Sequence, residues 1–227
     1  MPKRADLLRI YHLLLGHFGH RKWWPGETRF EVMVGAILTQ NTNWLNVEKA
    51  IAGLDARGLL EPEALADADV REIEKAVRSS GYFRQKARRI KRFAKWLVEE
   101  YGGDLDSLFS KELPELRAEL LSLNGIGPET ADSILLYAGG KPVFVVDAYT
   151  KRAFGRIGLL KKDAGYGEVQ RLFEGNLPRD VELYNDFHAQ IVELGKNYCK
   201  KKPLCGKCPL GKACETGRKV IKGGFRK

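Results

Sequence analysis

The sequence contains no long apolar segment. No uninterrupted apolar run approaches the roughly 18 residues that a membrane-spanning helix needs. The first sixteen residues mix charged and apolar side chains at helical spacing, and no small-residue cleavage site follows them, so they predict an amphipathic helix and not a signal peptide. Internal repeats and low-complexity linkers are missing as well. These absences predict a globular cytoplasmic protein without a membrane partner.

Strand-like segments are almost absent. The run KPVFVV at residues 141–146 is the one candidate, and it is too isolated to form a sheet. Helical periodicity covers most of the remaining chain, between glycine and proline breakers. The expected helices span residues 4–18, 28–38, 43–54, 61–66, 69–79, 84–101, 112–121, 128–139, 147–157, 165–175 and 181–197. The sequence therefore predicts an all-α protein with a small cysteine-bearing end.

Acidic side chains are scarce near the C-terminus. Residues 196–227 contain eleven Lys and Arg but a single acid, Glu215, whereas the preceding residues carry 28 charges of each sign. The whole net charge of +10 therefore lies in this tail. A concentrated basic segment predicts a polyanionic partner such as nucleic acid, although a merely solvated tail would have the same composition.

Cysteine is confined to one short segment, at Cys199, Cys205, Cys208 and Cys214. Clustering in a chain with cytoplasmic features favours metal ligation over disulfides. Zinc sites commonly use two close cysteine pairs, whereas here only the central pair is close. Four thiolates on a compact loop favour a [4Fe–4S] cluster, with zinc as the alternative. The lysines around them would offset the charge of a thiolate-bound cluster and present a basic face to DNA.

The segment LNGIGPETAD, residues 123–132, separates two of the expected helices. Gly125 and Gly127 permit backbone conformations that other residues resist, and Pro128 suits the first turn of a helix. The tight turn would point amide N–H groups outward at a helix N-terminus, where a DNA phosphate can bind. An ordinary helix–helix corner would have a similar composition.

Asp147 follows four apolar residues and opens the next expected helix. An aspartate at this position commonly serves as an N-cap. Close to a phosphate-binding turn, it could also face a reacting sugar.

Together, the hairpin LNGIGPETA, the segment VDAYTKR and the terminal cysteine loop resemble the endonuclease III superfamily of helix-hairpin-helix (HhH-GPD) DNA glycosylases. ILTQNTNWLNVEKAI and GYFRQKARRI also match in place, so the resemblance covers nearly the whole chain. The first cysteine gap has five residues, where the family more often has six. The resemblance implies base excision repair of double-stranded DNA containing a damaged base, in a bacterial or archaeal nucleoid. A monomer is expected.

The resemblance also implies two helical domains. One would span residues 23–135 and end in the helix-hairpin-helix. The other would combine residues 1–22 with residues 136–227 and carry the catalytic acid and the cluster loop, residues 199–214.

By position, Asp147 is the family's catalytic carboxylate, which would stabilise positive charge on the sugar and activate water. Gln40 and Tyr82 match residues that fill the gap left by the flipped base. Further DNA contacts are implied for the hairpin residues Gly125, Ile126, Gly127 and Thr130.

Family members that also cleave the DNA backbone carry a lysine in the hairpin, and its amine forms a Schiff base with the sugar. The matching residue here is Glu129, and a carboxylate cannot form a Schiff base. The resemblance therefore implies a hydrolytic glycosylase with weak or absent AP-lyase activity. Glu129 is then either an acid of the base pocket or a solvent-facing helix residue.

Three of the four tryptophans lie within residues 23–44, where core packing would be their ordinary role. Yet the order W-W-P, T-Q-N-T and then an aromatic resembles the bacterial 3-methyladenine DNA glycosylases of the endonuclease III type, which also have glutamate in the hairpin. The electron-rich faces of such a pocket suit a cationic alkylated purine. The implied base pocket consists of Trp23, Trp24, Pro25 and Trp44.

Two alternatives stay open. The same fold could act on other lesions, namely deaminated, oxidised or mismatched bases. The chain could also be a non-catalytic iron–sulfur DNA-binding protein.

Overall fold

The computed structural model describes residues 4–21, 24 and 26–223, with side chains from residue 6 onwards. This part of the chain is helical and contains no β-strand, so the all-α prediction is confirmed. None of the described helices is long and apolar enough to cross a lipid bilayer. The chain divides into two compact units, which we call unit 1 (1–23 and 142–227) and unit 2 (24–141).

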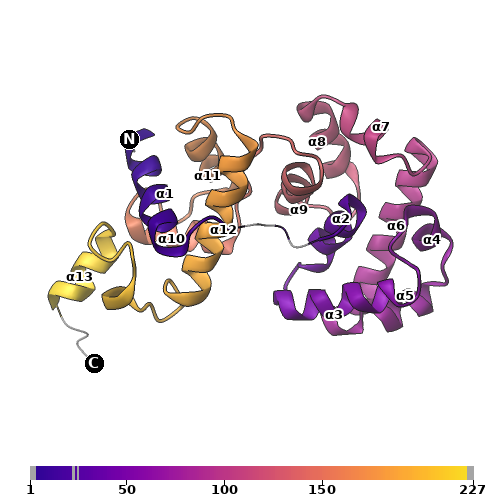
Figure 1. Ribbon diagram of the computed structural model, residues 1–227, viewed down its shortest axis with the longest axis horizontal. Helices are drawn as coiled ribbons and strands as arrows, with labels where there is room; N and C mark the ends of the chain where they lie inside the picture. The colour runs from indigo at the N-terminus through magenta and orange to yellow at the C-terminus, as the bar shows by residue number, and fades with distance from the viewer. Residues whose placement is uncertain (1–3, 22–23, 25, 224–227) are drawn as a thin grey trace. The chain divides into compact units, whose positions relative to one another are not determined.

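Unit 2 is a bundle of helices around α6, which lies along α4 and α5 (Figure 1). The buried face of α6 repeats at helical spacing, through Ala87, Ile90, Ala94 and Leu97, none of which is exposed. The helix ends at Gly102, whose φ of 61° is a left-handed cap that glycine adopts without strain. The elements are α2 (Arg29–Leu38), α3 (Trp44–Asp55), α4 (Pro62–Asp67), α5 (Val70–Ala76), η1 (Arg78–Ser80), α6 (Phe83–Tyr101), α7 (Leu105–Ser110), α8 (Leu113–Ser122), α9 (Pro128–Ser133) and the π-helical η2 (Ile134–Ala138).

The helix expected over residues 128–139 changes character at its centre. It is α-helical as far as Ser133 and continues as η2, which packs against α2. Beyond it, the Lys141 amine donates to the carbonyl oxygen of Lys111 at 2.8 Å. These contacts hold residues 136–141 in unit 2, whereas the sequence placed the boundary after residue 135.

Unit 1 joins the first helix of the chain to its last third. Its core is aromatic, with Phe144 stacked on Phe173 at 3.9 Å between ring centroids and Phe187 packed edge-on against both. The elements are α1 (Arg4–Phe18), α10 (Ala148–Ile157), α11 (Tyr166–Glu174), α12 (Val181–Asn197), η3 (Cys205–Lys207) and α13 (Glu215–Gly223).

Asp186 on α12 fixes the N-terminal segment to unit 1. Its carboxylate accepts from the Tyr11 hydroxyl at 2.8 Å and from the backbone N–H of Arg21 at 2.7 Å. Charged hydrogen bonds of this kind are stronger than neutral ones, so a single buried acid can hold α1 against a helix 175 residues away in sequence.

The strand-like run 141–146 is extended but has no partner strand among the described residues. Side chains of α11 bind its backbone instead. The N–H of Phe144 donates to Glu174 at 2.9 Å, and Gln170 donates to the Phe144 carbonyl oxygen at 2.9 Å. The backbone N–H and carbonyl oxygen of Phe144 therefore have hydrogen-bonding partners without a sheet, which is all that buried backbone groups require.

Two short helices, α7 and α13, were not expected from the sequence. α13 contains Gly217, and an added Cβ there would lie 2.3 Å from the carbonyl oxygen of Gly211. Only glycine allows this close approach of the two backbones, although glycine ordinarily disfavours a helix.

Candidate functional site

In the hairpin between α8 and α9, Gly125 has the special backbone conformation expected of it, whereas Gly127 has a φ of −96° that any residue can adopt. Gly125 adopts a φ of 94°, which other residues resist, and the Ile126 N–H donates to the Leu123 carbonyl oxygen at 3.0 Å. Pro128 occupies the first turn of α9. Gly127 is exposed and an added Cβ there would meet nothing within 4 Å, so this backbone is accessible in the structure.

Gln40 lies against the inner side of the turn. Its amide nitrogen donates to the Gly125 carbonyl oxygen and to the Thr130 hydroxyl, both at 3.0 Å. Its amide oxygen accepts from Arg89 at 2.5 Å. The Thr130 side chain is buried, so any influence of Thr130 on DNA would pass through the shape of the turn, whereas Gln40 is partly exposed.

A bidentate ion pair joins the two helices of the hairpin. The guanidinium of Arg117 on α8 binds both carboxylate oxygens of Asp132 on α9, at 2.6 and 3.1 Å. Asp132 is fully buried. The planar fork fixes both the distance and the rotation of α9 against α8.

The Lys86 side chain links two loops of unit 2 by hydrogen bonds. Its buried amine donates to the carbonyl oxygens of Leu38, at the end of α2, and Ser80, at the end of η1. Burial, with a smaller contribution from Arg89, lowers the pKa of Lys86 to about 8. The two anchored carbonyls lie just before Gln40 and Tyr82, so Lys86 sets the paths of both predicted DNA-contacting loops.

Tyr82 projects from the second of these loops. Its side chain is 69% exposed, and its φ of 46° is a left-handed conformation that non-glycine residues seldom adopt. Asn41, in the first loop, has a φ of 55°. Strained backbone of this kind persists only where the surroundings impose it, and it is common at functional sites.

Asp147 caps α10 in unit 1. Its Oδ1 accepts from the Thr150 N–H at 2.7 Å and from the Thr150 hydroxyl at 2.8 Å. The side chain is 13% exposed. The cap fixes one carboxylate oxygen and thereby orients the other, Oδ2, away from the helix N-terminus.

His188 on α12 faces that second oxygen, with Nε2 3.7 Å from Oδ2 of Asp147. The imidazole is buried. Burial lowers the pKa of His188, and the nearby Asp147 carboxylate opposes this shift only in part. His188 is therefore neutral at physiological pH, and the sequence did not single it out.

We expect the free energy of unfolding to fall on acidification because of His188. Its folded pKa is lower than the ordinary value of about 6.5, so the unfolded chain binds more protons between the two values. The contribution is complete above about pH 6.5 and is lost as the pH falls through the lowered value. Thermal unfolding of the wild type and His188→Gln from neutral to acidic pH measures it. Parallel pH profiles for the two proteins would contradict this assignment.

The aromatic residues predicted to hold the base form a cluster in unit 2. Trp24 and Trp44 pack edge to face at 4.9 Å between ring centroids, and Trp24 lies 5.2 Å from Tyr137 of η2. Trp23 and Pro25 lie outside the described residues. Trp24 also covers Gly35 of α2, where its indole nitrogen would lie 3.4 Å from an added Cβ.

Tyr137 was missed because its position follows from the π-helical turn. One extra residue per turn rotates the side chains of η2 relative to a continuous α-helix, and such turns are frequent at functional sites. Glu129, in the first turn of α9, has an exposed side chain.

The four cysteines gather at the C-terminal end of unit 1 and form no disulfides. Burial and the mutual repulsion of the thiolates raise the pKa of Cys208 to about 11, and burial chiefly raises the pKa values of Cys205 and Cys214. N–H groups approach two of the sulfurs: Arg156 donates to Cys199 at 3.3 Å and the Gly217 backbone to Cys214 at 3.4 Å.

The thiols of Cys199, Cys205 and Cys214 lie near enough to Cys208 for their charges to raise its pKa, as members of one thiolate ligand set would. Within the described residues, no three His, Cys, Asp or Glu side chains are arranged to hold one ion. A [4Fe–4S] cluster binds each of its four thiolates through a different iron.

Arg156 connects the cysteine segment to α10. Besides Cys199, its guanidinium donates to the carbonyl oxygens of Lys200 at 2.6 Å and Lys201 at 3.0 Å. α10 therefore carries Asp147 at its N-terminus and the principal anchor of the cysteine segment in its last turn.

The sequence matches known proteins over most of its length. Residues 34–179 match the family described as "HhH-GPD superfamily base excision DNA repair protein". A Methanocaldococcus jannaschii protein with the provisional name DNA repair glycosylase MJ1434 is 49% identical over 92% of this chain and 95% of its own. Endonuclease III of Thermotoga maritima is 34% identical over 87% of each chain.

Solved structures of the same fold include DNA complexes. A trapped endonuclease III–DNA covalent intermediate has a TM-score of 0.82 and 25% identity, covering 97% of this chain and all of that one. The Helicobacter pylori 3-methyladenine DNA glycosylase MagIII, bound to 1,N6-ethenoadenine, has a TM-score of 0.75 and 29% identity over 86% and 98% of the two chains. The chain therefore belongs to the HhH-GPD superfamily of base excision DNA repair proteins and is a DNA glycosylase of the endonuclease III superfamily.

Proposed function

We propose that this glycosylase hydrolyses the N-glycosidic bond of an alkylated purine such as 3-methyladenine in duplex DNA, with little or no cleavage of the strand. The observation that carries the proposal is Glu129 in the hairpin, at the position where strand-cleaving members of the family carry a lysine. Without that amine, water is the nucleophile.

Asp147 supplies the negative charge for the reaction. As the bond to the base breaks, positive charge develops on the sugar, and a fixed carboxylate stabilises it without having to reorganise. The Thr150 contacts hold Oδ1, so Oδ2 is the oxygen that orients water or accepts its proton. An N3-alkylated purine is already cationic and leaves readily, which reduces the need for an additional acid.

The cluster of Trp24, Trp44 and Tyr137 supports the proposed base specificity. A cationic base is attracted to electron-rich aromatic faces, by roughly 2 kcal/mol or more where water is excluded. The Trp44 indole N–H donates to Glu48 at 2.6 Å, which fixes the orientation of one ring. MagIII, which is similar to this chain, is a 3-methyladenine glycosylase bound to a modified adenine. Trp23 and Pro25 are proposed members of the same pocket.

We also propose that the four cysteines hold a [4Fe–4S] cluster. When bound, the cluster would supply a structural cross-link of the C-terminal segment and no chemistry on the base. The lysines of residues 200–202 place positive charge beside it, which suits DNA phosphates.

The proposal is tested by product analysis on methylated duplex DNA, with borohydride trapping in parallel. We expect free 3-methyladenine, intact strands containing abasic sites, and no covalent adduct. A Glu129→Lys variant is the matched control. It places an amine at the position used by strand-cleaving members, so it shows that borohydride trapping can detect a covalent adduct in this protein.

Each other outcome corrects a different part of the proposal. A trapped adduct with the wild type would mean that another lysine attacks the sugar. Release of uracil, hypoxanthine or oxidised bases in place of methylated purines would refute the specificity but keep the hydrolytic mechanism. Specific DNA binding without release of any base would favour a non-catalytic protein.

A further inference from the structure

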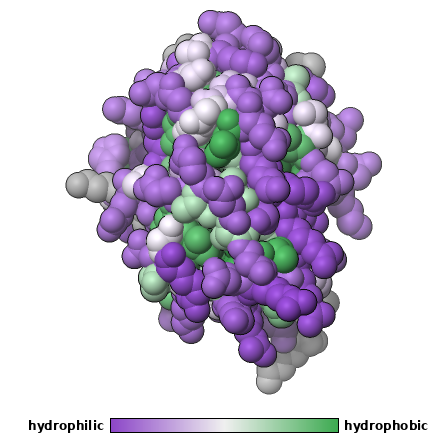
Figure 2. Space-filling model, turned by 90° about the vertical axis from the view of Figure 1, so that its right-hand side faces the viewer, coloured by the Kyte–Doolittle hydropathy of each residue, from purple (hydrophilic) through white to green (hydrophobic). Residues whose placement is uncertain are grey.

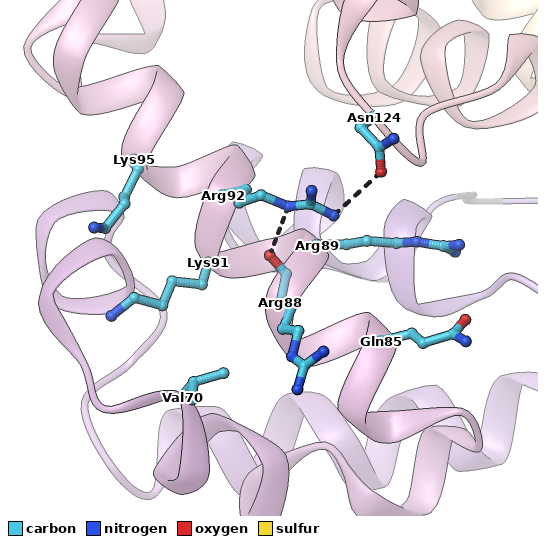
Figure 3. Close-up of a pocket in the computed structure, with 8 residues that line it drawn as sticks. All are labelled: Val70, Gln85, Arg88, Arg89, Lys91, Arg92, Lys95 and Asn124. Atoms are coloured by element: carbon cyan, nitrogen blue, oxygen red, sulfur yellow. Dashed lines mark hydrogen bonds between the residues drawn. The ribbon is translucent and has the colours of Figure 1, made fainter.

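A concave site lined by cations lies along α6, outside the proposed catalytic residues (Figure 3). Its volume is about 670 Å³. Five cationic residues of α6 line it, together with Asn124 from the hairpin turn, and no acidic residue does. The cations are Arg88, Arg89, Lys91, Arg92 and Lys95.

The spacing of three of these cations places them on one side of the helix. Arg88, Arg92 and Lys95 follow one another at intervals of four and three residues, and all three are exposed. At 1.5 Å per residue, they extend over about 10 Å of the helix. This equals the axial rise of about three nucleotides of one DNA strand, at 3.4 Å each.

The positive charges of the site are not compensated within the described part of the chain. None of the five cations takes part in an ion pair there. The hydrogen bonds that they do make go to neutral acceptors. Arg89 binds the Gln40 amide, Lys91 a backbone carbonyl, and Arg92 both the Asn124 amide and the Arg88 carbonyl. Repulsion among cations held this close favours binding of a polyanion.

The site begins at the hairpin itself. Arg92 donates to Asn124 at 3.2 Å, and Asn124 immediately precedes Gly125 (Figure 3). Arg89 packs so closely against the turn that an added Cβ on Gly125 would lie 2.6 Å from its Nε. A DNA strand whose phosphate is held at the turn would therefore continue along α6.

From these observations we infer that the α6 site binds consecutive backbone phosphates of the same DNA duplex, beyond the segment held by the hairpin. The inference rests on the DNA-binding part of the proposed function and is independent of the base that is removed. Viewed from the side of unit 2 where α4, α5 and α6 lie, the surface is mostly hydrophilic with small separate apolar patches (Figure 2). Such a surface suits a wet, charged contact of this kind.

The test compares two charge-matched double variants of the full-length holoprotein. Arg88→Ala with Lys95→Ala removes two exposed cations of the site, neither of which donates a side-chain hydrogen bond in the described structure. Lys49→Ala with Lys75→Ala removes two exposed cations of α3 and α5 that do not line it. The affinity for undamaged duplex DNA is measured against salt concentration, so a failure of base release cannot affect the result.

We expect the magnitude of the slope of log K against log salt to fall by roughly 2 for the first variant, about 0.9 per lost phosphate contact. The affinity at low salt falls about tenfold, as two exposed charge contacts would give. The control pair keeps the wild-type slope, and Arg88→Lys with Lys95→Arg restores it because the charges are kept.

Equal losses in both double variants would indicate a general effect of net charge and overturn the inference. So would an unchanged slope in the first variant. If inorganic phosphate raised the Tm of the wild type but not of the first variant, and the slope stayed unchanged, the ligand would be a small phosphorylated molecule and not DNA.

Discussion

Replacing Asp147 by asparagine is expected to slow base release by about 10²- to 10⁴-fold, while the affinity for duplex DNA stays nearly unchanged. Asparagine caps helices as well as aspartate does, so its side-chain oxygen can still accept from the Thr150 N–H and hydroxyl. The fold of α10 is then preserved. Only the negative charge of the carboxylate and its capacity to accept a proton are lost.

Single-turnover release of the base, with enzyme in excess, measures the chemical step separately from product dissociation. A binding assay on the same DNA and a thermal unfolding curve accompany it. The matched control is Thr150→Ser, which keeps the hydroxyl that binds Oδ1 and should retain most of the rate. An Asp147→Asn protein as active as the wild type would remove Asp147 from the mechanism.

Arg117→Ala is expected to lower the free energy of unfolding by about 3 kcal/mol. This is near the low end of the destabilisation that follows when one member of a buried ion pair is removed. Asp132 is fully buried, whereas Arg117 is 27% exposed, so water can partly replace the lost guanidinium. For a chain of this size, such a change lowers Tm by roughly 6–12 °C.

Thermal and urea unfolding of the holoprotein measure this effect, and Arg117→Lys is the control. Lysine keeps the charge but lacks the planar fork that binds both carboxylate oxygens, so its Tm should lie between those of the wild type and the alanine variant. Equal stability of all three proteins would show that the pair does not hold the hairpin together.

Local patterns explain why part of the site could be predicted from the sequence. Three features each lie within a short segment whose residue order predicts its local structure or chemistry. They are the glycine turn of the hairpin, the N-cap at Asp147 and the four grouped cysteines. Gly125 does take the positive φ that its place in the turn suggested, and Asp147 does cap α10.

The remaining features depend on contacts between distant segments. His188 meets Asp147 only because α12 packs on α10, and Tyr137 meets Trp24 only because η2 packs on α2. Arg156 reaches the cysteine segment across more than forty residues. No local pattern specifies such partners.

The basic site on α6 was missed for a different reason. The first 195 residues carry equal numbers of acidic and basic side chains, so the net charge along the sequence points only to the tail. The signal was nevertheless present in FRQKARRIKRFAKW. A helical wheel of this segment, unlike its net charge, shows Arg88, Arg92 and Lys95 on one side of the helix.

The left-handed backbone at Tyr82 has a consequence for attempts to make this glycosylase more heat-resistant. That conformation costs of order 1–3 kcal/mol, and glycine would adopt it freely. A screen that scores only thermal resistance would therefore reward Tyr82→Gly. The same substitution would remove an exposed aromatic ring at a position that matches DNA-contacting residues of the family. Selection for heat tolerance would therefore favour glycine at this position, and selection for repair would favour tyrosine.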